Sequence, residues 1–163
     1  MAAANWPECI SFTLTQEGGL VNDPNDPGGL TNFGISQAAY PGLPIAALTR
    51  SDAEAIYRRD YWTPVAGDGL PAGADLMVFD MGVNAGVNLS ARLLQQCVGV
   101  EQDGAIGPET LAALAGHDAL QVIAALADAQ LAYYHNLANW ARYGDGWGAR
   151  VHRRENTARE MIS

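Results

Sequence analysis

Hydrophobic residues recur at intervals of three and four along most of the chain, which is the spacing of one face of an α-helix. The first such segment is followed by Gly18-Gly19, a pair that ends helices in the manner of a C-terminal cap. The pattern therefore predicts a first helix with Glu17 in its last turn. The residues expected on its apolar face are Trp6, Cys9, Ile10, Thr13 and Leu14.

The same periodicity predicts further helices later in the chain. Ser51 and Glu54 have the spacing of a capping box, and Pro108 stands at a favoured first helical position. We expect Gly144-Asp145-Gly146 to end one long helix and to precede a last one. The expected helical segments are 51–62, 71–86, 89–98, a helix from 108, 118–143 and 147–161.

The segment between the first and second of these patterns has a different composition. Residues 20–34 are dense in Asn, Asp, Pro and Gly, which favour consecutive tight turns or a short irregular hairpin. The expected fold class is therefore mainly α, with a turn-rich or β-hairpin loop after the first helix. The length of 163 residues is that of one domain spanning 1–163, with two lobes at 1–88 and 89–163 as the alternative.

Composition and charge exclude several classes of function. A net charge of −9 argues against nucleic-acid binding, which needs a basic surface. All nine cations are Arg, so lysine Schiff-base chemistry and a P-loop are excluded, and we expect no metal and no other cofactor. Cys9 and Cys97 favour buried thiols over a disulfide. The start has no signal-peptide pattern and no stretch is apolar enough for stable membrane insertion.

Glu17 is the first candidate for chemistry. Hydrolysis of a glycosidic bond needs a protonated acid and a second polar group that places water or stabilises the transition state. A helix C-terminus raises the cost of ionising an acid, and the neighbouring glycines leave room for a sugar ring. Asp26 and Thr31 follow on the loop that folds back. The alternative is an exposed Glu17 at a helix end, with Asp23 and Asp26 forming Asx turns.

The run from Glu17 to Ile35 resembles the N-terminal signature of the N-acetylmuramidases of glycoside hydrolase family 108. Leu20 departs from the pattern, since the family usually has an aromatic residue there. The resemblance implies a lysozyme-like helical fold, cleavage of the β-1,4 bond after N-acetylmuramic acid in peptidoglycan, and Glu17 as the essential acid. The order Glu, Asp, Thr also resembles phage lysozymes of another family, in which Asp and Thr serve the attacking water, and this resemblance implies that role for Asp26 and Thr31. The matching positions are Glu17, Gly18, Gly19, Asp26, Gly28, Gly29, Thr31, Gly34 and Ile35.

The likeness extends through Phe79-Asp80 and Asn84 to a C-terminal half similar to that family's peptidoglycan-binding region. Asp80 rivals Asp26 as the second carboxylate, and a buried pair of Asp80 with Asn84 is the alternative to a cleft role. Aromatic residues at helical spacing are more often core than sugar platforms. Trp147 and Arg150 are interpreted as structural and the Arg-rich last helix as a solvated face. The expected substrate-binding residues are Asp80, Asn84, Trp62, Phe33, Gly28 and Gly29.

The sequence thus predicts a monomeric hydrolase of peptidoglycan glycan strands. A lytic transglycosylase on the same bond and a non-catalytic peptidoglycan-binding module are the alternatives, and inversion or retention stays open. Without a signal peptide, the enzyme is expected to be made in the bacterial cytoplasm and to reach the wall after release. Release through a phage holin and a role in another secretion route are both compatible with the sequence.

Overall fold

The first helix forms as the apolar pattern predicts. In the computed structural model, which describes residues 5–163, α1 spans Trp6–Glu17 with a proline in its first turn. Its buried face includes Cys9, Ile10 and Leu14. Gly18 has φ +78°, and its N–H bonds to the Leu14 carbonyl oxygen at 3.2 Å, so the helix ends there. Glu17 accordingly occupies the last turn, as predicted.

The turn-rich segment folds into a small antiparallel sheet, which confirms the hairpin expectation. The strands are β1 (Val21–Asn22), β2 (Leu30–Asn32) and β3 (Ile35–Ser36), in the order β1-β2-β3. Val21 pairs with Thr31, and Thr31 pairs with Ser36 on its other side. Phe33 and Gly34 join β2 to β3 with φ values of +54° and +76°, as a two-residue type I′ connection requires.

Helix α2 (Arg50–Tyr57) begins earlier than the sequence pattern suggested. The predicted capping box at Ser51 and Glu54 is wrong. Thr49 is the N-cap: its hydroxyl accepts the Asp52 N–H at 3.1 Å, and the Asp52 carboxylate accepts the Thr49 N–H at 2.9 Å. The chain continues without a break into a π-helical segment, η3 (Arg58–Trp62). Two short 3₁₀ helices flank this unit, η2 (Ile45–Ala47) and η4 (Gly67–Gly69).

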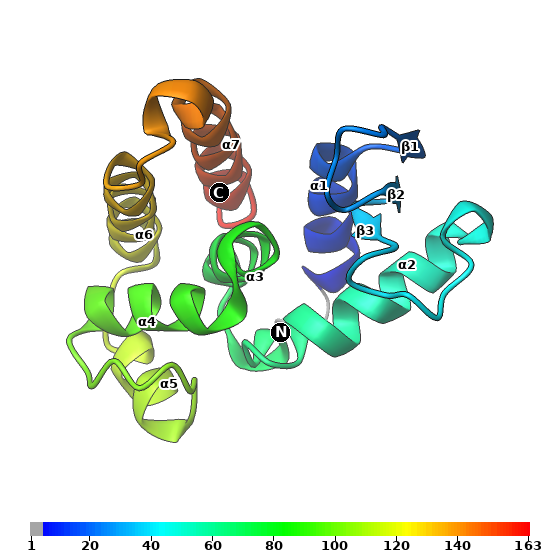
Figure 1. Cartoon of the computed structure of the whole chain (residues 1–163). Coiled ribbons are helices and arrows are strands. Elements are labelled where there is room, and N and C mark those ends of the chain that lie inside the picture. The colour runs from blue at the N-terminus through cyan, green and yellow to red at the C-terminus, as the bar shows by residue number, and fades with distance from the viewer. Residues whose placement is uncertain (1–4) are drawn as a thin grey trace.

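Helix α3 (Ala74–Ala85) is the central element, and every residue from 74 to 82 is buried. It contacts α1, α4, α6 and α7, so it is buried on all sides rather than on the single face expected from periodicity. In Figure 1, α1, the sheet and α2 lie on one side of α3, and α4 to α7 lie on the other. The remaining helices are α4 (Val87–Val98), α5 (Pro108–Ala115), α6 (Ala119–His135) and α7 (Trp140–Glu160).

The expected helix over 118–143 is wrong at its C-terminal end. Helix α6 ends at His135. A new helix, α7, begins at Trp140 and continues through the Gly144-Asp145-Gly146 segment. The Trp140 ring accounts for the glycine inside this helix. It lies one turn before Gly144 and so close to it that a Cβ there would meet ring carbons at 2.6 Å. The same ring lies against His135 at the end of α6, with ring centroids 3.8 Å apart. Gly144 therefore makes room for the Trp140 ring rather than ending the helix.

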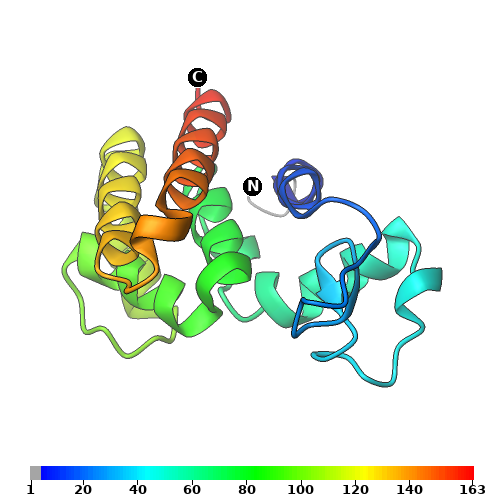
Figure 2. The ribbon, with the colours of Figure 1, turned by 45° about the horizontal axis from the view of Figure 1, so that its top comes forward.

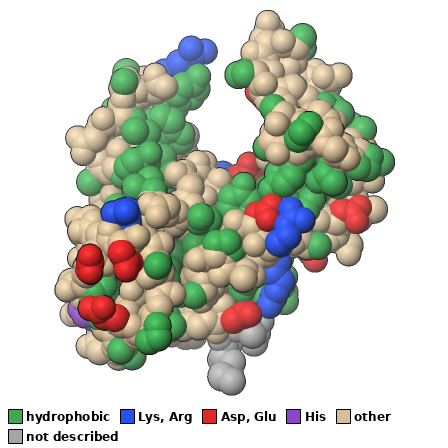
Figure 3. Space-filling view, turned by 60° about the horizontal axis from the view of Figure 1, so that its bottom comes forward, with side chains coloured by type: hydrophobic (Ala, Val, Ile, Leu, Met, Phe, Trp, Pro, Cys, Tyr) green, Lys and Arg blue, Asp and Glu red, His purple; other side chains and the backbone are tan. Residues whose placement is uncertain are grey.

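The two sides of the molecule are separated by an open hollow. Figure 2 shows α1 and the sheet facing α7 and α3 across a space, and Figure 3 shows that side chains leave it unfilled at one end. Among residues 5–163 no single helix is long and apolar enough to cross a membrane. Only α5 and α6 taken together have that length and composition, and they are bent by 118°.

Candidate active site

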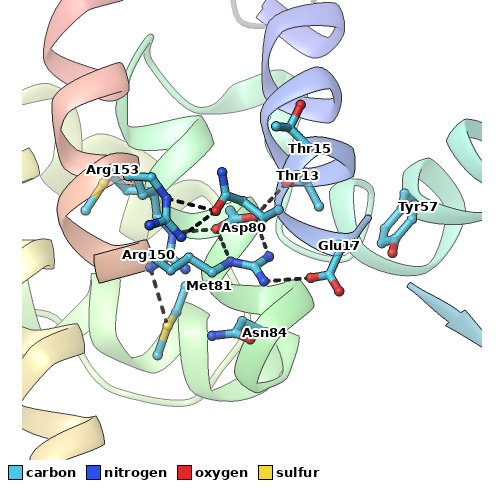
Figure 4. Close-up of polar contacts among 12 residues, drawn as sticks. Thr13, Thr15, Glu17, Tyr57, Asp80, Met81, Asn84, Arg150 and Arg153 are labelled. Atoms are coloured by element: carbon cyan, nitrogen blue, oxygen red, sulfur yellow. Dashed lines mark hydrogen bonds and ion pairs between the residues drawn. The ribbon is translucent and has the colours of Figure 1, made fainter. Parts of the chain in front are cut away.

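Glu17 reaches into the hollow from the end of α1, where it meets a cation from the other side of the molecule. Its Oε1 lies 2.7 Å from Nη1 of Arg150, which comes from α7 (Figure 4). The Glu17 side chain is 22% exposed and that of Arg150 11% exposed. The carboxylate is thus partly accessible to a ligand while its ion pair is screened little by solvent.

The same guanidinium also binds Asp80 on α3. Nε and Nη2 of Arg150 donate to the two Asp80 carboxylate oxygens at 3.0 and 2.8 Å, a bidentate arrangement. Thr13 of α1 donates its hydroxyl to Asp80 at 2.7 Å. One arginine therefore bridges two carboxylates, and the Asp80 end of the bridge is anchored to three helices.

A second arginine completes this buried network. Arg154, one turn after Arg150, donates Nε to Asp80 at 2.7 Å, and both side chains are fully buried. Its Nη1 donates to Gln130 of α6, whose own amide donates to the Met77 carbonyl oxygen at 2.9 Å. Burial raises the pKa of Asp80, but the Arg154 and Arg150 charges outweigh burial and hold it at about 2. Asp80 is therefore ionised and structural.

The tip of the β2–β3 hairpin packs against the other side of Glu17. A Cβ at Gly34 would lie 2.8 Å from both Cβ and Oε2 of Glu17 and 2.6 Å from the Tyr57 hydroxyl oxygen. That hydroxyl donates to the Phe33 carbonyl oxygen at 2.6 Å and so fastens the hairpin tip to α2. Burial raises the pKa of Tyr57, and the nearby Glu17 charge raises it further. Tyr57 is thus a fixed hydrogen-bond donor next to the candidate acid.

Asp26 and Thr31 lie on the same sheet but do not contact Glu17 through any bond. Asp26 is exposed in the turn between β1 and β2, where its Oδ1 accepts the Gly28 N–H at 2.8 Å in an Asx turn. Thr31 lies on β2 and faces away from the buried Asn32, because side chains alternate along a strand. Gly29, with φ +69°, completes the turn. The assignment of water activation to Asp26 and Thr31 stays a prediction.

Two of the expected substrate-binding residues are excluded from that role by burial. Trp62 is 1% exposed and packs edge-on against Trp6 and Phe79, with ring centroids 5.2 and 5.5 Å away. Asp80 is likewise buried and is saturated by its two arginines. Neither side chain can touch a sugar. The prediction of a cleft role is therefore wrong for Trp62 and Asp80, and Asp80 is removed as a rival second carboxylate.

Phe33 and Asn84 remain near the candidate acid. Phe33 is half-buried at the hairpin tip, and its carbonyl oxygen is held by Tyr57. Asn84 is half-buried one turn after Asp80 on α3, and its amide donates to the Tyr134 hydroxyl instead of pairing with Asp80. Figure 4 shows Asn84 on the α3 side of the Glu17–Arg150 pair. Sugar contacts by Phe33, Asn84, Gly28 and Gly29 stay predictions.

The reading of the Arg-rich last helix as a solvated face is wrong for its central arginines. Arg150 and Arg154 are four residues apart and therefore share one side of α7, which is turned toward Asp80. Arg153 lies nearer the surface and donates to Gln16 at 2.7 Å. The available sequence signal was the i, i+4 spacing of two arginines together with a carboxylate on an apolar helix face.

No group of three or more His, Cys, Asp or Glu side chains within residues 5–163 is arranged to hold a metal ion. What the site offers instead is a partly accessible carboxylate and a guanidinium that neutralises it, on the two helices that face each other across the open hollow. In its protonated form such a carboxyl group can give a proton to a leaving oxygen, and the guanidinium stabilises the carboxylate that remains.

Comparisons with known proteins identify the family and the fold of this chain. Residues 10–86 match the family model described as glycosyl hydrolase 108, and residues 89–153 match one described as a predicted peptidoglycan domain. The solved structure of SagA from Brucella abortus is 39% identical to this chain. Its TM-score is 0.88, and the alignment covers 98% of this chain and 96% of SagA. No curated protein sequence matches this chain.

Proposed function

Since the chain belongs to the glycosyl hydrolase 108 family and is a lysozyme-like glycoside hydrolase that acts on peptidoglycan, we propose that it is an N-acetylmuramidase. In this proposal it cleaves the β-1,4 bond between N-acetylmuramic acid and N-acetylglucosamine, and Glu17 is the general acid. The observation that supports this assignment is the Glu17–Arg150 ion pair at the edge of the hollow. The pair is one of the contacts between the segments matched by the two family models, because Glu17 belongs to the first segment and Arg150 to the second.

The acid step follows from the charges around Glu17. Protonated Glu17 donates to the glycosidic oxygen, and the carboxylate that remains is negatively charged. Arg150 lies 2.7 Å from that carboxylate, so its positive charge lowers the energy of the state in which the proton has left. Arg150 is in turn held in place by Asp80, which makes Asp80 a positioning residue two contacts away from the reaction.

The second half of the reaction is assigned to the sheet. Asp26, assisted by Thr31, is proposed to hold the water that attacks the anomeric carbon from the face opposite Glu17. An inverting reaction requires about 6.5–9.5 Å between the two carboxyl groups, whereas about 5 Å favours retention. Because the proposed water attacks from the face opposite the leaving oxygen, we propose inversion, which a freshly cleaved product reveals by the anomeric configuration of its new reducing end in NMR spectra.

The deciding experiment is reducing-end analysis of purified peptidoglycan digested by the parent protein and by Glu17→Gln. After borohydride reduction, mass spectrometry is expected to find muramitol ends in the parent digest. Glu17→Gln is expected to lose about 10²- to 10⁴-fold in rate, the usual contribution of a general acid. The matched control is Glu8→Gln, which changes an exposed glutamate at the other end of the same helix.

Each other outcome refutes a defined part of the proposal. Glucosaminitol ends would place the cut on the other glycosidic bond. Anhydromuramic ends would identify a lytic transglycosylase, in which the sugar's own hydroxyl replaces water. Full activity in Glu17→Gln would remove Glu17 as the acid, and a parent protein that binds but never cuts would favour a peptidoglycan-binding module.

A further inference from the structure

The side of α7 that carries Arg150 also carries two aromatic residues and a glycine in the two turns before it. Tyr143, Gly146, Trp147 and Arg150 succeed one another at helical spacings of one to four residues and lie on neighbouring parts of the same side. We call Tyr143, Gly146 and Trp147 the α7 aromatic surface. Because α7 rises 1.5 Å per residue, this surface extends about 10 Å along the helix from Arg150.

Helix α1 covers this side of α7 only from Arg150 onward. Arg150 contacts Glu17 and Arg153 contacts Gln16. Helix α1 ends at Glu17, and the chain then turns away into β1. The preceding turns of α7 therefore face the hollow. Tyr143 is 44% exposed, and Figure 3 shows hydrophobic side chains along the α6–α7 side of the hollow.

Gly146 is not explained by packing within the protein. A glycine inside a helix costs about 1 kcal/mol relative to alanine, so it needs a reason. Gly144 has one, because the Trp140 ring occupies the space of its Cβ. Gly146 has no atom within 4 Å of the position that a Cβ would take, although it lies between Tyr143 and Arg150 on the exposed side. The open backbone there suits the close approach of a ligand.

The aromatic rings are held rigidly. Trp147 stacks on the buried Tyr134 with ring centroids 5.1 Å apart and an interplanar angle of 23°. Tyr143 packs on Trp147 at 5.5 Å, and the Asn84 amide donates to the Tyr134 hydroxyl from beneath. The Arg142 guanidinium carbon lies over the Tyr143 ring, 5.2 Å from its centroid. An aromatic platform with amide, hydroxyl and guanidinium groups beside it matches the apolar face and polar rim of an N-acetylated sugar ring.

We propose that the α7 aromatic surface is a glycan subsite, which binds N-acetylhexosamine rings of the strand beyond those at Glu17. The occupant is a glycan strand because the surface is continuous through Arg150 with the acid site, and this inference rests on the proposed function. Tyr143 and Trp147 stack on sugar rings, and Gly146 lets the strand lie against the helix. The surface then determines how long a strand the enzyme prefers.

The test measures affinity as a function of oligomer length. Full-length proteins carrying Glu17→Gln, which prevents cleavage, are titrated calorimetrically with β-1,4-linked N-acetylglucosamine oligomers from disaccharide to hexasaccharide. Affinity of the starting protein is expected to rise with length. Tyr143→Ala is expected to weaken hexasaccharide binding about 2- to 12-fold, the range for one aromatic contact, and to leave disaccharide binding unchanged. Tyr143→Phe is expected to retain the affinity of the starting protein.

Two further variants separate binding from folding. Gly146→Leu is expected to fold normally, because its side chain meets open space. It is expected to lower the affinity for long oligomers, because the new side chain fills the subsite. Leu120→Ala is the matched control, since Leu120 is 47% exposed at the distant start of α6 and is expected to change nothing. Circular dichroism and thermal unfolding verify the fold of every variant.

The outcomes distinguish this subsite from the proposed function. A protein that cleaves peptidoglycan, but whose Tyr143→Ala and Gly146→Leu variants bind long oligomers as the control does, overturns the subsite alone. No length dependence in the starting protein, or binding of wall only when its stem peptides are present, also overturns it. Length-dependent binding through Tyr143 in a protein that never cuts supports the subsite and refutes the muramidase activity.

Discussion

Removal of the Asp80 charge tests the buried network of ion pairs that positions the Arg150 side chain. In Asp80→Asn the shape of the side chain is kept, but Arg150 and the fully buried Arg154 lose the carboxylate that four hydrogen bonds of 2.7 to 3.0 Å now serve. Leaving one partner of a buried ion pair uncompensated costs about 3–5 kcal/mol. For a chain of this length, each kcal/mol lowers the midpoint of thermal unfolding by about 2–4 °C.

We therefore expect Asp80→Asn to lower that midpoint by about 6–20 °C. The matched control is Glu54→Gln, which removes an exposed partner of Arg50 at i, i+4 and is expected to cost about 0.3–0.5 kcal/mol. The assays are calorimetry and urea unfolding at neutral pH. If Asp80→Asn loses no more stability than Glu54→Gln, the buried ion pairs do not hold α1, α3 and α7 together, and our account of how Arg150 is positioned fails.

Three further predictions concern pH and the surroundings of the acid. The Asp80 carboxyl has a pKa of about 2 in the folded protein against 3.8 for the free group, so its ionisation contributes about 2 kcal/mol to the free energy of unfolding. This contribution is complete above about pH 4 and is lost as the pH falls toward 2. Urea unfolding across that range should show the loss in the parent protein and not in Asp80→Asn. Gly34→Ala and Gly99→Ala both introduce a Cβ at positive φ, but only the first displaces the candidate acid, so kcat should fall about tenfold or more for Gly34→Ala alone. Arg150→Lys keeps the charge but cannot bridge two carboxylates, so we expect a stability loss of about 2 kcal/mol and a lower kcat, whereas Arg153→Lys should resemble the parent in both.

Local sequence signals account for the parts of the site that lie close together in the chain. The apolar spacing before Gly18 places Glu17 in the last turn of α1, because helix periodicity and a glycine cap act within a few residues. The Asn, Asp, Pro and Gly residues after it form the hairpin for the same reason, since turn preferences belong to the residues of the turn. The family motif also lies in this segment, so the candidate acid and its place at the end of α1 could be predicted together.

The partners of these elements were not predictable from local signals. Periodicity shows which residues share a face, but it does not show what covers that face. Trp62 has the same spacing whether it stacks on sugar or on Phe79, and only the packing of α2, η3 and α3 buries it. The helix over Trp140–Glu160 likewise continues through Gly144 and Gly146, where glycine predicted an end, and its first residue, Trp140, packs against His135 of α6.

What the sequence by itself determined is the position of the candidate acid, the mainly helical class and the hairpin beside Glu17. What only the tertiary structure decided is the electrostatic setting of that acid. Arg150 lies far from Glu17 in the chain, and Asp80 pairs with arginines from a helix more than sixty residues away. Such contacts depend on how whole helices pack around α3, because a buried charge is stable only where the fold brings an opposite charge to it.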